Sequence, residues 1–219
     1  MSVNNLQSLI NGKWFIEQTH AKALLTPFFA ILNKVQVEKQ DTIDFSILTT
    51  STQQQISGSS FTSSKNEEDY ILIVDIKDPI YKYNQDCGPR GTKSKQATMQ
   101  RFEKDIHCKG VVLDIDSGGG QVSGTPEFHD FIKSYSKPVV TYTDGYMCSA
   151  AYYLGSAADH VIANKRADKI GSIGTMISFL DMTGYYAKKG AKLITAYASK
   201  STDKNKDFEE LVKGNPEGY

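Results

Sequence analysis

The stretch that decides the fold is PVVTYTDGYMCSAAYYLGSAA, residues 138–158. A run of β-branched and aromatic residues ends at Asp144-Gly145, and a run rich in small residues begins at Ser149. The stretch therefore predicts a buried strand, a turn and a helix. Ser149 stands where the helix begins, and the first N–H groups of a helix have no acceptor within it. A serine there is either an ordinary helix cap or a nucleophile whose developing negative charge these groups can receive.

A second strand and turn precede this stretch, where residues 111–122 read VVLDIDSGGGQV. Three consecutive glycines are costly to order, so we expect the backbone there to approach a ligand closely or to present its N–H groups. The spacing fits neither GxGxxG nor GxxxxGK[ST], which argues against a phosphate site. N–H groups near Gly119 and Gly120 fit an oxyanion hole for an intermediate formed on Ser149. The glycine loop thus favours the nucleophile interpretation of Ser149.

Three motifs, Asp116–Gly120, Gly145–Tyr152 and Ile170–Gly174, follow one another along the chain. In this order and spacing they resemble the signal peptide peptidase A family of serine peptidases, which includes the phage protein C head-maturation proteases. The family has a Clp/crotonase-like α/β fold, a superhelix of β-β-α units whose mostly parallel sheet is covered by helices. Two positions depart from the usual pattern: Gly118 replaces a proline, and Ala150-Ala151 replaces a pair of glycines found in many members.

The resemblance implies a serine endopeptidase that cleaves peptide bonds through an acyl-enzyme, with a lysine as the base. Ser149 matches the nucleophile, and the oxyanion hole maps to Gly119, Gly120 and Ala150. The segment that lines the family's substrate cleft maps to Gly171, Ser172 and Gly174. This chemistry needs no metal and no organic cofactor. The expected partner is a protein or peptide substrate, as in phage or prophage capsid or scaffold processing.

Two lysines are candidates for the base. Lys200 matches the family's lysine by position. The local motif that precedes this lysine in the family is absent here, so the register is open by a few residues and Lys204 is the alternative. A lysine-rich loop is otherwise simply a solvated surface. None of the four histidines suits a Ser-His-Asp triad by its place along the chain; these are His20, His107, His129 and His160.

The chain is predicted to divide after residue 67. Residues 1–67 form an N-terminal helical and linker segment, with helical spacing over 23–37 and a Ser/Thr/Gln-rich loop over 49–68. Residues 68–219 form the peptidase domain, C-terminally short for the family, with a flap over 78–94. Strands are expected at 70–76, 110–115, 138–143, 160–163, 171–178 and 191–197, and helices at 96–107, 124–135, 149–158 and 181–189.

The composition restricts the partners and the compartment. Lys and Arg total 25 and Asp and Glu total 25, so the lack of net charge argues against binding to nucleic acid or to an anionic membrane. Three cysteines and no apolar run of ~20 residues indicate a reducing, cytoplasmic location without a membrane anchor. The family also implies a homo-oligomer. Two alternatives stay open: an acyl-CoA enzyme of the crotonase fold that is not a protease, and an inactive peptidase-like scaffold.

Overall fold

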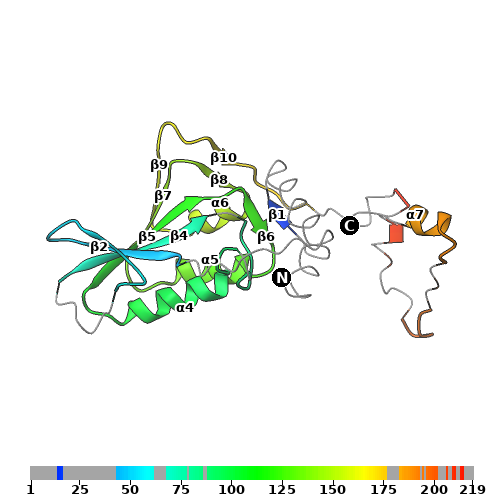
Figure 1. Ribbon diagram of the computed structural model, residues 1–219, viewed down its shortest axis with the longest axis horizontal. Helices are drawn as coiled ribbons and strands as arrows, with labels where there is room; N and C mark the ends of the chain where they lie inside the picture. The colour runs from blue at the N-terminus through cyan, green and yellow to red at the C-terminus, as the bar shows by residue number, and fades with distance from the viewer. Residues whose placement is uncertain are drawn as a thin grey trace. The chain divides into compact units, whose positions relative to one another are not determined.

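The computed structural model divides into two compact units, Met1–Ser178 and Phe179–Tyr219. The residues it describes are 14–16, 43–61, 68–77, 79–85, 88–176, 183–192, 194, 196–201, 206, 209–210 and 213–214. The first unit contains the sheets and the candidate site (Figure 1). In the second unit the described residues include one helix that can be delimited, α7 (Thr183–Lys188).

The main sheet of the first unit has six strands and is mostly parallel. Their order is β3 (Gln55–Ser57), β2 (Phe45–Thr49), β4 (Tyr70–Lys77), β5 (Cys108–Asp116), β7 (Val139–Thr143) and β9 (His160–Ala163). The four strands from β4 to β9 run parallel, while β2 and β3 add an antiparallel hairpin at one edge. A mostly parallel sheet needs helices to cover it, and the chain supplies them between its strands.

The connections between the parallel strands repeat a β-β-α pattern. β5 is followed by the short strand β6 (Gly119–Gln121) and helix α5 (Thr125–Lys133). β7 is followed by β8 (Tyr146–Cys148) and helix α6 (Ala150–Gly155). The short strands pair outside the main sheet, β8 with β10 (Lys169–Gly171) and β6 with β1 (Trp14–Ile16). The predicted fold class, an α/β superhelix of β-β-α units, is confirmed.

The core forms where the parallel strands meet the helices. Alternate residues of β5, namely Val111, Leu113 and Ile115, are almost fully buried. Helix α4 (Thr92–Glu103) adds Met99 and Phe102, and α5 adds two further apolar residues to the same cluster. In Figure 1, α4 and α5 lie next to one another along one side of the sheet. Burial of this apolar surface fixes the frame that carries the turns of the site.

Helix α6 packs closely because it ends in a glycine. A Cβ on Gly155 would come within 2.8 Å of Met147 Sδ and 3.1 Å of Ile115 Cδ1. Any larger residue would therefore push the helix off β5 and β8. Since α6 begins directly after Ser149, this contact also sets the position of the serine.

Most expected elements are confirmed, and their ends shift by a few residues. The strand expected at 171–178 is wrong, because the strand here is β10 (Lys169–Gly171) and residues 172–175 form a loop. The strand expected at 160–163 coincides with β9, and the helix expected at 96–107 begins earlier, at Thr92. The loop interpretation of 49–68 is wrong where β3 forms, because its polar residues pair with β2 at the sheet edge. The strand expected at 191–197 is absent from the residues described there, among which Ile194 is 81% exposed. The helix expected over 23–37 lies outside the described residues.

A buried ion pair ties the start of the β2 hairpin to helix α4. Lys95 Nζ lies 2.6 Å from Asp44 Oδ2 and donates to the Asp75 carbonyl oxygen at 2.5 Å. Burial lowers the pKa of Lys95, and the nearby Asp44 carboxylate acts in the opposite direction. Both side chains are less than a tenth exposed, so neither charge can be solvated if the other is removed.

We expect Lys95→Met to lower the free energy of unfolding by about 3 kcal/mol, because it leaves the Asp44 carboxylate buried without its main partner. Lys77→Met is the matched control, since Lys77 pairs with Asp114 at 2.7 Å but is 44% exposed. That exposed pair should contribute less than about 1 kcal/mol. Urea denaturation of the two variants measures the difference, and equal losses would contradict the role given to Lys95.

Candidate active site

Ser149 occupies a strained turn between β8 and α6. Its backbone has φ 53° and ψ −114°, a conformation that residues other than glycine rarely adopt and that costs about 1–3 kcal/mol. Its side chain makes no capping hydrogen bond to the helix. The ordinary-cap interpretation therefore does not account for this serine. The turn instead holds the hydroxyl away from the helix that follows it.

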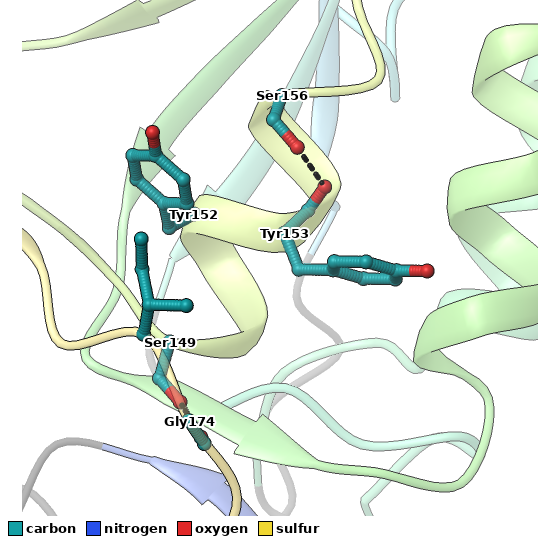
Figure 2. A pocket seen from close by; sticks show the side chains of 6 residues that line it. Ser149, Tyr152, Tyr153, Ser156 and Gly174 are labelled. Atoms are coloured by element: carbon teal, nitrogen blue, oxygen red, sulfur yellow. Dashed lines mark hydrogen bonds between the residues drawn. The ribbon is translucent and has the colours of Figure 1, made fainter.

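The third motif lies against Ser149. The Ser149 N–H donates to the Gly171 carbonyl oxygen at 2.8 Å, and its hydroxyl donates to the Gly174 carbonyl oxygen at 3.3 Å. Gly171, Ser172 and Gly174 all have positive φ, at 122°, 52° and 147°. Two glycines in this loop thus take backbone conformations that a side chain would strain. Figure 2 shows the Ser149 side chain pointing toward Gly174.

The glycine loop reaches the same place from β5. Ser117 pairs with Met147 in an isolated bridge, its N–H donates to Tyr146, and its carbonyl accepts from the Cys148 N–H at 3.1 Å. The Ser117 hydroxyl accepts the Gly119 N–H at 3.1 Å, as expected for a residue that shapes the glycine turn. An oxyanion that took this N–H would have to displace the Ser117 hydroxyl.

Gly120 is required by a close backbone contact. A Cβ on Gly120 would overlap the backbone of Ile80, which forms a parallel bridge with Gly120. Ile80 lies in the segment interpreted as a flap, and it donates to the Gly119 carbonyl at 3.0 Å. One edge of β6 is therefore closed by Ile80, and the other faces β1.

Asp116 supports the turn that precedes Ser149. Its Oδ1 accepts the Tyr146 N–H at 2.9 Å. A Cβ on Gly145 would overlap this carboxylate, so Gly145 lets Asp116 approach the turn. The adjoining Cys148 is fully buried, and its thiol donates to the Lys169 carbonyl at 3.4 Å. Cys148 thus lies inside the fold as a small apolar residue.

An apolar cavity of about 230 Å³ opens beside Ser149 (Figure 2). Its lining consists of Ser149, Tyr152, Tyr153, Ser156, Ile173 and Gly174. The ring of Tyr153 stacks on His129 of α5 with centroids 4.3 Å apart, which fixes one wall. The sequence patterns described above did not predict that Tyr152 and Tyr153 line a cavity. Their adjacency to the serine on one short helix was the signal that they also face the site.

The two lysine candidates lie in the second unit. Lys200 is exposed on a turn in which the Ser201 N–H donates to the Ala198 carbonyl at 2.8 Å. Lys204 lies outside the described residues. The three described histidines make contacts or take positions unrelated to Ser149. His107 contacts Asp69, His129 contacts Asp130, and His160 begins β9.

Comparison with known families agrees with this geometry. The model of peptidase family S49 matches residues 132–213, a range that includes both Ser149 and Lys200. The Clp protease model matches residues 82–168, which contain the glycine loop and the turn at Ser149. The chain is therefore related to the S49 and Clp peptidases, and the resemblance indicated by the three motifs is confirmed.

Two individual relatives of this chain are also named as proteases. A putative protease of Methanocaldococcus jannaschii is 31% identical over 151 residues, 65% of this chain and 48% of the relative. The capsid assembly protease C of Escherichia phage lambda is 31% identical over 113 residues, 51% of this chain and 26% of the relative. The chain thus spans half or less of these relatives.

Among solved structures, a probable enoyl-CoA hydratase from Mycobacterium thermoresistibile matches 45% of this chain and 46% of its own, with 15% identity and a TM-score of 0.35. A likeness that low adds nothing to the fold assignment. In the described part of the chain, no helix is long and apolar enough to cross a membrane.

Proposed function

We propose that this chain is a serine endopeptidase that forms its acyl-enzyme on Ser149. The observation that carries the proposal is the backbone of Ser149, held at φ 53° between the glycine loop and an apolar cavity. Strain of this kind persists only where the surrounding structure imposes it, and it clusters at functional sites. The match to peptidase family S49 over the same residues supports the assignment.

In the proposed reaction the Ser149 hydroxyl oxygen attacks the scissile carbonyl carbon, and Lys200 accepts the hydroxyl proton. The C–N bond then breaks, and the leaving amine takes that proton. Water hydrolyses the resulting ester and regenerates Ser149. N–H groups of Gly119, Gly120 and Ala150 stabilise the oxyanion formed in both steps.

Lys200 must be shielded from water to act as a base, because a hydrated ammonium holds its proton. We therefore expect its exposed loop to be covered in the working enzyme, by the substrate or by a neighbouring copy in a closed homo-oligomer. The site requires no metal or organic cofactor. The relationship to a phage capsid assembly protease supports capsid or scaffold proteins of a phage or prophage as substrates, within the cytoplasm.

A serine-reactive probe tests the proposal and the cavity together. We expect a peptidyl diphenyl phosphonate to phosphonylate Ser149, as located by mass spectrometry of the digested protein. A leucine analogue should react at least about 10-fold faster than an aspartate analogue, because burying a carboxylate against Tyr152 and Ile173 would leave it unpaired. Ile173→Lys should reduce this preference. Labelling elsewhere, or none, would contradict the assignment of Ser149.

A further inference from the structure

The chain's own N-terminal segment lies on the strand that carries the proposed oxyanion glycines. β1 (Trp14–Ile16) pairs antiparallel with β6, with Phe15 opposite Gly120 and Ile16 opposite Gly119. These residues are far apart in the sequence, so the pairing is a tertiary contact made at the site. In Figure 1, β1 and β6 lie next to one another, and Figure 2 shows the blue strand β1 below the loop of Gly174.

The hydrogen-bonding directions of β6 show which of its groups face β1. Ile80 donates to the Gly119 carbonyl at 3.0 Å and accepts from the Gln121 N–H at 2.8 Å. Backbone groups alternate in direction along a strand, so those of Gly120 face the opposite edge, where β1 lies. Phe15 lies opposite Gly120, so the two residues occupy a hydrogen-bonded pair of the antiparallel ladder. The neighbouring Trp14 N–H points away from β6.

This edge is also where an extended peptide would lie to reach Ser149. The strand begins just after Ser117, which pairs with Met147 two residues before the nucleophile, and β6 contacts α6. Extended peptides bind exposed strand edges through backbone hydrogen bonds, with pockets taking alternate side chains. The helix that β6 contacts, α6, carries Tyr152 and Tyr153, which with Ile173 line the cavity beside Ser149. The opposite edge is closed by Ile80.

We infer that Trp14–Ile16 occupies the docking edge for the peptide substrate and competes with it, so that the N-terminal segment restrains the enzyme from within. The inference rests on the proposed function of Ser149. While β1 holds the Gly120 N–H, that group is available neither to a docked peptide nor to the oxyanion formed on it. A strand of three residues is marginal by itself, so an incoming substrate can displace it. Attachment to the same chain gives it a high effective concentration.

A pair of proline variants in the full chain tests the competition. Phe15→Pro removes the N–H that faces Gly120, whereas Trp14→Pro removes one that points away. We expect Phe15→Pro to raise the rate of Ser149 labelling by the leucine phosphonate at least about 5-fold, and Trp14→Pro to change it less than about 2-fold. Hydrogen exchange of the Gly120 amide, measured by NMR in the Ser149→Ala background, should accelerate about 10-fold in Phe15→Pro alone.

The two readouts separate failure of the inference from failure of the proposed function. If Ser149 is labelled at the same rate in all three proteins, the peptidase assignment stands and the competition is wrong. Equal effects of the two proline variants would also overturn it, because only one of them faces β6. If exchange accelerates but Ser149 is never labelled, β1 covers an edge that serves no peptidase, and both proposals fail.

Discussion

Ser149→Ala is expected to lower kcat/KM for a peptide substrate by about 10⁴-fold, because it removes the hydroxyl oxygen proposed to form the ester. Some rate over the uncatalysed reaction should remain, since the oxyanion N–H groups and the cavity are left in place. Cleavage of casein or of the chain itself, followed by gel electrophoresis and by a fluorogenic peptide, measures the loss.

Cys148→Ala is the matched control for that result. The two residues are adjacent, but Cys148 is fully buried and its thiol contacts the Lys169 carbonyl. We expect the cysteine variant to keep most of its activity and to show only a modest loss of stability. Circular dichroism should show that both variants fold. If Ser149→Ala cleaves at the wild-type rate, the nucleophile assignment is wrong and a binding scaffold or another reaction class must be considered.

The sequence predicted the frame of the site because strong local signals coincide with it. The β-branched run that ends at Thr143 and the small residues after Ser149 each favour one type of element, and the structure has β7 and α6 there. Glycines at 120 and 145 are needed by contacts with Ile80 and Asp116. The sequence displays such glycines, although it cannot show which neighbour requires them.

What the sequence did not predict depends on contacts between distant segments. β1 has three residues, too few for an alternating pattern, and its partner lies more than a hundred positions away. The polar strand β3 forms because β2 offers an edge, and polarity had suggested a loop. At 191–197 the apolar pattern predicted a strand that the described residues do not form, because such a pattern does not by itself provide a partner strand. The cavity beside Ser149 needed the fold to bring Ile173 to Tyr152.

Lys200→Arg is expected to abolish activity as completely as Lys200→Ala, by about 10³-fold or more in kcat. Arginine preserves the positive charge and the length of the side chain, but the guanidinium does not give up its proton in the working range and so cannot take one from Ser149. A role in binding or surface charge would instead be preserved by arginine. The comparison of Arg and Ala at one position thus separates a base from a structural cation.

Lys204→Arg is the control, because Lys204 lies four positions from Lys200 in the same lysine-rich stretch of sequence and the variant should remain active. Single-turnover cleavage measures the chemical step directly, and leucine phosphonate labelling reports the reactivity of Ser149 in each variant. If Lys204→Arg is inactive and Lys200→Arg is active, the base lies four positions further along and the dyad mechanism survives. If both arginine variants cleave at the wild-type rate, neither lysine takes the Ser149 proton. The acyl-enzyme would then need another base, and the Ser-Lys mechanism would be wrong for this chain.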